Sequence, residues 1–256
     1  MLFRSVHKTL SYEYVLVMVD TQAPGAEALL GKCKEALSKD ELTRGVGYPF
    51  LSVLDADGKV ITAQRTDPLE EGDHHHPGRV KEFLNKWTVA AKDAEVVLRD
   101  GLSRASSEDK RVFLTFSAPW CGWCHKLADW MAQPEVAAIF DREFVTVSVD
   151  IDRMTHGKEI LTRFRPSEQG GIPWFAVLDS KGKSLGDSDG PKGNIGYPFK
   201  PEEIDHFMAL IAKSGGQHID SAAQERLRQS LKENAERIQK QMDARQVAPA
   251  PAAAAR

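Results

Sequence analysis

The sequence predicts an α/β fold, and three observations lead to that prediction. A strand–turn–strand pattern occurs twice, because residues 47–59 align with residues 171–183. Each occurrence precedes a proline, Pro77 or Pro201, that suits the first turn of a helix. Between the two occurrences, an apolar run at 112–116 leads into residues with helical periodicity. Strands that alternate with amphipathic helices are typical of α/β domains.

Composition and charge exclude several classes of protein. The 256 residues suffice for one large domain or two small ones. A net charge of −3 gives no electrostatic reason to expect nucleic acid or an anionic membrane as a partner. No apolar run approaches the roughly 20 residues that cross a bilayer. The opening residues lack the apolar stretch and cleavage site of a signal peptide.

The aligned segments predict two copies of one domain. Residues 12–20 align with 142–150, and in both copies β-branched and aromatic residues predict a strand, over 14–19 and over 144–149. The turn compositions at 55–58 and 179–182 predict that the two following strands pair antiparallel. Two copies of one domain explain both alignments most economically.

Only the second copy has a complete set of predicted elements. It adds a helix over 93–106 with one apolar face. We therefore predict a partial copy over 1–88, a complete domain over 89–216, and a C-terminal segment over 217–256. That segment begins with a long helix, followed by a low-complexity Ala/Pro tail predicted to be disordered.

The long helix is predicted to begin at Asp220-Ser221, which suit a helix cap. One apolar stripe runs along it, formed by Ile219, Ala223, Leu227, Leu231, Ile238 and Met242. Packing against its own domain is favoured over binding to a partner, because most apolar stripes belong to a core.

The cysteines are few, and their spacing points to chemistry. Cys33 stands alone and is interpreted as a half-buried helical residue. Cys121 and Cys124 are separated by two residues at a predicted helix start, so their Cα atoms fit the roughly 4.4–6.8 Å window of a disulfide. Cys121, at the exposed helix N-terminus, is predicted to attack a substrate disulfide, and Cys124, one turn further and more buried, to resolve the mixed disulfide. Trp120 and Trp123 border the exposed cysteine and are candidate substrate contacts.

The segment APWCGWCHKL, with Gly171-Ile172-Pro173, resembles the thioredoxin superfamily, in particular the thioredoxin-like domains of bacterial periplasmic disulfide-interchange proteins. The resemblance covers about residues 93–212 and implies a thioredoxin-like fold. It implies that Pro173 is cis and that Ile172 lies opposite the cysteines, with its backbone available to an extended substrate. Gly122 joins the predicted substrate-binding residues.

The expected function is that of a protein-disulfide oxidoreductase without a bound cofactor. Its expected partners are proteins with disulfides or dithiols and an unidentified redox partner. The family's buried acid is replaced by Thr115, and His125 is a candidate for proton transfer in its place. The alternative is a non-catalytic module that uses the fold for binding.

Three metal or cofactor interpretations are less favoured. Zinc needs about four ligands, and there is no second cysteine pair. Residues 121–125 also match the C-x-x-C-H pattern of haem attachment, but the preceding strand and the later Ile-Pro loop favour the redox interpretation. The adjacent histidines His74, His75 and His76 are interpreted as a solvated loop before a helix.

Two further expectations concern loops and the first copy. The glycine-rich loop 186–200 is expected to form a lip beside the cysteines through Tyr197 and Phe199, unless both rings pack under the final helix. The first copy lacks the segment that carries the cysteines. We therefore expect a truncated N-terminus and an exported or periplasmic location, although the chain itself shows no signal peptide.

Overall fold

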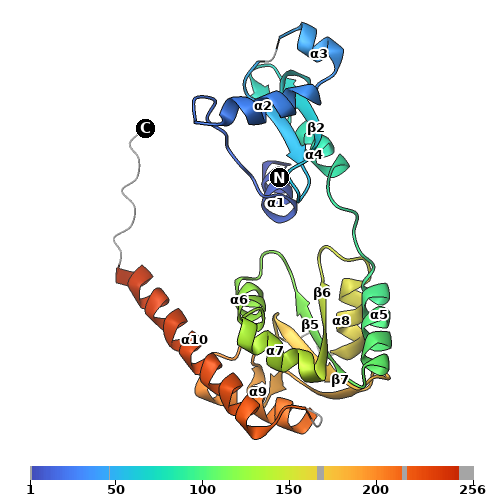
Figure 1. The fold of residues 1–256 in the computed structure, drawn as a ribbon, viewed down its shortest axis with the longest axis vertical. Helices are drawn as coiled ribbons and strands as arrows, with labels where there is room; N and C mark the ends of the chain where they lie inside the picture. The colour runs from blue at the N-terminus through green and yellow to red at the C-terminus, as the bar shows by residue number, and fades with distance from the viewer. Residues whose placement is uncertain (1, 46, 166–169, 215–217, 248–256) are drawn as a thin grey trace. The chain divides into compact units, whose positions relative to one another are not determined.

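The computed structural model describes residues 2–45, 47–165, 170–214 and 218–247 (Figure 1). The chain divides into two compact units, Met1–Ala90 and Ala91–Arg256. Each unit is described by itself. The predicted disordered tail, 248–256, lies outside the described residues.

The C-terminal unit is built on a four-stranded sheet in the order β6-β5-β7-β8. The strands are β5 (Arg111–Ser117), β6 (Phe144–Asp150), β7 (Trp174–Leu178) and β8 (Ser184–Asp187). The central strand β5 pairs parallel with β6 and antiparallel with β7, and β7 pairs antiparallel with β8. These pairings show that the apolar run at 112–116 is a strand, and they confirm the predicted strand at 144–149 and the second hairpin.

Helices cover both faces of this sheet (Figure 1). One layer contains α5 (Ala94–Ser107) and α8 (Gly157–Phe164). The other contains α6 (Gly122–Met131), α7 (Pro134–Glu143), α9 (Pro201–Ser214) and α10 (Ser221–Val247). A small hairpin, β9 (Asp189–Gly190) with β10 (Gly193–Asn194), lies between β8 and α9 in the chain. This mixture of helices and strands is the predicted α/β fold.

The core has two halves because successive residues of a strand point to opposite faces of the sheet. Phe113 of β5 packs with the aromatic rings of Phe140, Phe144, Phe175 and Phe207. Its neighbours Val112, Leu114 and Phe116 belong to the half covered by α5 and α8. A strand that is buried on both faces reads as a continuous apolar run.

Helix α10 completes the first half of the core. The predicted stripe is buried or packed against the same cluster, from Ile219 to Met242. Asp220 caps the helix, since its Oδ1 accepts the backbone N–H of Ala223 at 2.7 Å. Trp130 of α6 donates its indole N–H to Ser230 of α10 at 3.0 Å. The helix therefore packs on its own unit, as predicted.

The N-terminal unit contains a two-stranded sheet, β1 (Phe50–Leu54) with β2 (Val60–Arg65), paired antiparallel as predicted. Four α-helices are described in it: α1 (Leu2–Glu13), α2 (Ala26–Glu35), α3 (Lys39–Thr43) and α4 (Pro77–Lys86). A 3₁₀ turn, η1 (Asp67–Leu69), and a short hairpin of β3 (Glu70–Glu71) and β4 (His74–His75) connect β2 to α4. Cys33 lies in a helix, α2, as predicted, but it is buried rather than half-buried.

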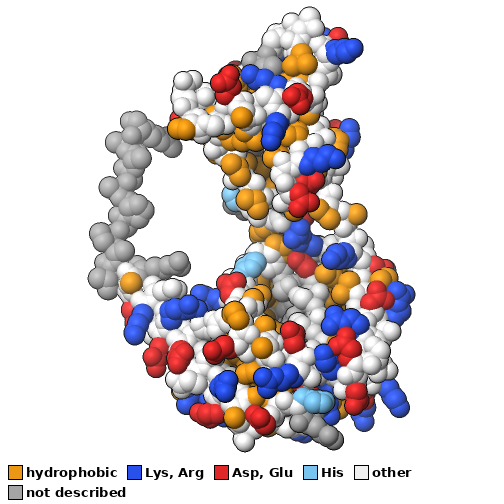
Figure 2. Space-filling view, in the orientation of Figure 1, with side chains coloured by type: hydrophobic (Ala, Val, Ile, Leu, Met, Phe, Trp, Pro, Cys, Tyr) orange, Lys and Arg blue, Asp and Glu red, His pale blue; other side chains and the backbone are white. Residues whose placement is uncertain are grey.

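The predicted strand over 14–19 is wrong. Residues 14–20 adopt no helix or strand, and Val15, Leu16, Val17 and Met18 are largely exposed. Figure 2 shows hydrophobic side chains at the surface of this unit. The matching segment in the other unit is β6, which pairs with β5. Among the described residues of the N-terminal unit, β1 pairs only with β2. A strand needs a hydrogen-bonded neighbour, so composition alone did not make this segment a strand.

The end of α1 is fixed by tertiary contacts instead. Tyr14 donates its hydroxyl to the carbonyl oxygen of Leu84 in α4 at 2.6 Å. Val6 and Leu10 of α1 pack with Tyr14 on the small core around Phe83. Within the described part of the chain, no helix is long and apolar enough to span a membrane.

Candidate functional site

The two cysteines lie where β5 leads into α6. Cys121 is the N-cap of α6, and Cys124 lies in its first turn. The two sulfur atoms form a disulfide, with the Cα atoms 5.2 Å apart. The backbone N–H of Cys124 donates to the Sγ of Cys121 at 3.1 Å. A sulfur atom at this position is held by a helix N-terminal N–H and lies at the positive end of the helix dipole.

Cys121 was predicted to be exposed and Cys124 to be more buried, but the two cysteines are buried to the same extent. Cys121 is 4% exposed and Cys124 is 5% exposed. Ile151 and Ile172 pack against them, together with Ala118. The expectation of an exposed Cys121 is therefore wrong for this structure, because neighbouring loops cover the helix N-terminus.

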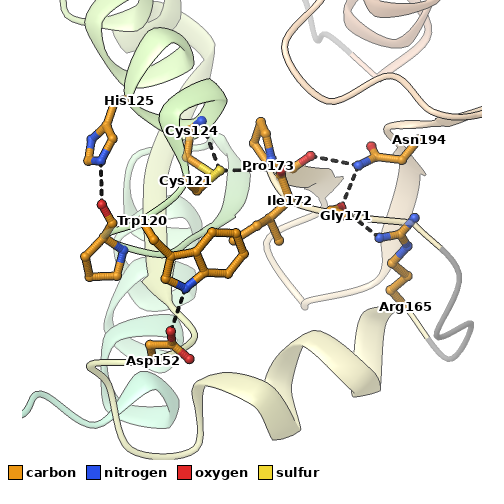
Figure 3. The surroundings of a disulfide bond; sticks show 11 residues. Trp120, Cys121, Cys124, His125, Asp152, Arg165, Gly171, Ile172, Pro173 and Asn194 are labelled. Atoms are coloured by element: carbon orange, nitrogen blue, oxygen red, sulfur yellow. Dashed lines mark hydrogen bonds between the residues drawn. A yellow bond between two sulfur atoms is a disulfide. The ribbon is translucent and has the colours of Figure 1, made fainter. Parts of the chain in front are cut away.

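Residues 171–173 approach the disulfide from the other side (Figure 3). The carbonyl oxygen of Ile172 lies 3.4 Å from the Sγ of Cys121. The Ile172-Pro173 peptide bond is cis, as is Tyr48-Pro49 in the N-terminal unit. Pro173 itself is buried, so it supports the segment from behind, whereas Gly171 is exposed. The structure thus brings Ile172 and the cysteines together, as the resemblance implies.

The two tryptophans beside the cysteines are exposed and are held in different ways. Trp120 donates its indole N–H to Asp152 at 2.7 Å. Trp123 stacks on Tyr197, with ring centroids 6.0 Å apart, and contacts Phe199 at 5.8 Å. Gly122 lies between the cysteines and is also exposed. Both indoles therefore keep part of their surface exposed beside the cysteines, whereas Trp130 and Trp174 are buried in the core.

His125 lies at this end of α6, but its ring is turned toward Pro119 (Figure 3). Its Nε2 is 2.9 Å from the carbonyl oxygen of Pro119. A carbonyl only accepts hydrogen bonds, so Nε2 carries the proton in this contact. Thr115, at the position of the family's acid, lies 3.5 Å from the carbonyl oxygen of Val147. In this geometry neither side chain is aimed at the sulfur atoms.

The loop 186–200 does contact the site, through its aromatic residues. Tyr197 is buried in the core and Phe199 packs against it, while both rings touch Trp123 of the cysteine motif. The two expectations for this loop are therefore compatible, because the rings pack in the core and border the site at once. Burial raises the pKa of Tyr197 to about 12.

Removing the hydroxyl of Tyr197 is predicted to stabilise the protein. This hydroxyl is buried and finds no hydrogen-bond partner among the described residues. Replacing Tyr197 with Phe keeps the ring contact and removes an unsatisfied polar atom, so we expect the free energy of unfolding to rise by about 1 kcal/mol. The measurement is urea denaturation. Tyr14→Phe is the matched control. Its free energy of unfolding is expected to fall by about 1 kcal/mol, because the hydroxyl of Tyr14 donates a hydrogen bond to Leu84.

The histidines before α4 make contacts within their own hairpin. In the described part of the chain, no group of three or more His, Cys, Asp or Glu side chains is placed to hold a metal ion. His75 and His76 face Glu70 and Glu71 across the β3–β4 hairpin instead, at 3.8 and 3.6 Å. These histidines lie before α4, and the side chain of His76 accepts the backbone N–H of Arg79.

Several residues around the cysteines escaped sequence reasoning. Asp152 binds Trp120, and Arg165, Asp189 and Asn194 surround the segment 170–173. Asp189 and Asn194 belong to the loop 186–200, so its glycine-rich composition was the available signal. No sequence signal pointed to Arg165, because a single arginine after an amphipathic helix has no distinguishing pattern.

The site combines a disulfide between a central strand and a helix with a cis proline opposite it. A family model described as thioredoxin-like matches residues 93–180. The chain therefore contains a thioredoxin-like domain over these residues.

Known proteins share this similarity over part of their length. The chain is 26% identical to protein disulfide isomerase-like 1-1 of Arabidopsis thaliana over 153 residues, which cover 57% of this chain and 27% of that protein. A disulphide isomerase structure from Xylella fastidiosa matches at 24% identity and a TM-score of 0.40, covering 47% of this chain and 92% of that one. The C-terminal domain of DsbD from Neisseria meningitidis matches at 23% identity and a TM-score of 0.31, covering 39% and 84%.

Proposed function

We propose that this chain is an oxidoreductase that exchanges thiols and disulfides with other proteins, with Cys121 as nucleophile and Cys124 as resolving cysteine. The observation that carries the proposal is the disulfide at the start of α6, where the Sγ of Cys121 accepts the N–H of Cys124. A negative charge on Cys121 gains from this N–H and from the helix dipole. A negative charge on Cys124, one turn into the helix, would be stabilised less by the backbone N–H groups and by the helix dipole.

The reaction begins from the reduced pair. The thiolate of Cys121 attacks one sulfur of a substrate disulfide, so that bond breaks and a mixed disulfide forms. The released substrate thiolate takes a proton from solvent. Cys124, deprotonated, then attacks the Sγ of Cys121, which restores the Cys121–Cys124 disulfide and frees the second substrate thiol. Two electrons pass from the cysteine pair to the substrate, and the same steps in reverse oxidise a dithiol.

The surroundings of the disulfide suit a protein substrate better than a small molecule. The exposed faces of Trp120 and Trp123 offer apolar contact next to the cysteine pair. The segment around Ile172 adds backbone groups opposite Cys121. An extended peptide that crosses this surface would bring its cysteine to Cys121. The protein partners are therefore substrates with disulfides or dithiols and a redox partner that restores the pair.

The test is insulin reduction with dithiothreitol as electron source. The wild-type chain is expected to precipitate insulin faster than dithiothreitol alone, and Cys121→Ser is expected to match the uncatalysed rate. The low exposure of Cys121 favours one alternative, a binding module with a structural disulfide. An inert wild-type chain would support that alternative and contradict the proposal.

A further inference from the structure

Asn194 lies behind the segment that faces the cysteines. Its Nδ2 donates to the carbonyl oxygen of Gly171 at 2.7 Å and to that of Pro173 at 2.9 Å (Figure 3). Its Oδ1 accepts the backbone N–H of Gly196 at 3.1 Å. This is the amide orientation in which all three contacts pair a donor with an acceptor. The side chain therefore links the loop 186–200 to two points of the segment 171–173.

The two bound carbonyls flank the one that meets the disulfide. Gly171 and Pro173 turn their oxygens toward Asn194, and the intervening Ile172 places its oxygen 3.4 Å from the Sγ of Cys121. Fixing the outer two carbonyls thus fixes the direction of the middle one. Asn194 acts on the active site through the backbone, without touching the sulfur atoms.

An ion pair between the buried Arg165 and the exposed Asp189 holds the same segment from a second direction. Arg165, at the end of α8, donates its Nε and Nη2 to the carboxylate of Asp189 at 3.1 and 2.8 Å. Its Nη1 donates to the carbonyl oxygen of Gly171 at 3.1 Å. Asp189 also accepts the indole N–H of Trp174 at 3.0 Å. Such a two-pronged pair constrains orientation as well as distance.

Gly170 leaves room for this arrangement. It has φ +104°, and a Cβ there would collide with the Nη2 of Arg165. A side chain at residue 170 would both strain the backbone and displace the guanidinium group. The sequence therefore supplies a glycine where the arginine passes closest to the segment.

We propose that Asn194, supported by the Arg165–Asp189 pair, is a positioning residue that holds residues 171–173 ready to receive a substrate peptide. Arg165, Asp189 and Asn194 are called the carbonyl clamp below. The proposal rests on the proposed function, since it concerns the surface on which the substrate lies. A segment that is already fixed loses little backbone freedom when a peptide pairs with it, so binding costs less.

The clamp also limits access to Cys121 by small reagents. Ile172 packs against the cysteine pair, and the clamp fixes Ile172. Loosening the segment is therefore expected to uncover the sulfur while weakening peptide binding. Chemical access and substrate affinity should change in opposite directions, which is the signature of a positioning role.

The test compares Asn194→Ala and Asn194→Asp with wild type. Alanine removes the two donated hydrogen bonds, and aspartate of the same shape turns a carboxylate oxygen toward two carbonyl oxygens. We expect the KM for a disulfide-containing peptide to rise roughly tenfold in Asn194→Ala and further in Asn194→Asp, with kcat within about twofold. Alkylation of reduced Cys121 by iodoacetamide should become several times faster. Lys192→Ala, on the exposed part of the same loop, is the matched control and should change neither value.

Arg165→Lys supplies a second variant. Lysine keeps the positive charge but cannot reach Asp189 and Gly171 together in the same planar geometry. It is expected to reproduce the rise in KM and the faster alkylation. Because Arg165 is buried, thermal unfolding is measured alongside, and the kinetic values are compared at a temperature where each variant is folded.

Two failures have different meanings. If both Asn194 variants keep the wild-type KM and alkylation rate, the positioning role is overturned. The positioning role is also overturned if alkylation becomes faster only at temperatures at which the variant unfolds. If the wild-type chain does not reduce insulin, the proposed function fails, yet the alkylation measurement still reports whether the clamp holds Ile172 over Cys121.

Discussion

Replacing Cys124 with Ser is expected to trap the chain in covalent complexes with its substrates. Cys121 still attacks a substrate disulfide, but no second thiol remains to release the product. The mixed disulfide should accumulate within the time of wild-type turnover and disappear on treatment with dithiothreitol. Non-reducing gel electrophoresis followed by mass spectrometry of the trapped species measures the effect and identifies the substrates.

Two variants control this experiment. Cys121→Ser should trap nothing, because the attacking sulfur is absent. Cys33→Ser should behave as wild type, since Cys33 is buried in α2 of the other unit. Equal trapping by Cys121→Ser would reverse the assigned roles of the two cysteines.

The largest loss of stability is expected from Arg111→Met. Glu143, at the end of α7, is 2% exposed and pairs with Arg111 at the start of β5 at 2.5 Å. It also accepts the backbone N–H and the ring Nδ1 of His218, each at 3.1 Å. Arg111→Met removes the guanidinium group that pairs with a buried carboxylate, a change that costs about 3 kcal/mol in comparable pairs. Urea denaturation measures the loss.

Arg104→Met is the matched control, because Arg104 pairs with Glu108 on the exposed side of α5. Exposed pairs of this spacing contribute about 0.5 kcal/mol or less. Adding Glu143→Gln to Arg111→Met should recover part of the stability by removing the buried charge. If the two arginine variants lose the same free energy of unfolding, the pair with Glu143 contributes no more to stability than an exposed pair.

The sequence was most informative where local patterns and burial agree. The strand at 144–149 and the stripe of α10 both occur as predicted, because each forms where it can bury its apolar face. Cys121 and Cys124 were recognisable because three residues of helix bring two sulfur atoms within bonding distance. These predictions succeeded because they depend on residues that are close together in the sequence.

Prediction failed where the outcome depends on distant partners. Residues 14–19 have strand composition, yet no neighbouring strand pairs with them in the described residues. The low exposure of Cys121 depends on Ile151 and Ile172, which come from other loops. The carbonyl clamp unites residues from α8 and from the loop before α9, and no short motif records such a combination.

The position of α10 has a consequence for synthesis of the protein. Chains emerge from the ribosome starting at the N-terminus, and domains fold as units once their residues are available. Phe113 and Trp130 are buried in a cluster that is completed by apolar side chains from residues 219–242, which are synthesised last. A nascent chain that has reached residue 216 has all four strands of the sheet but leaves part of that cluster open to water. Until α10 is made, the aromatic residues that pack on it stay exposed to water, although both cysteines are already in place.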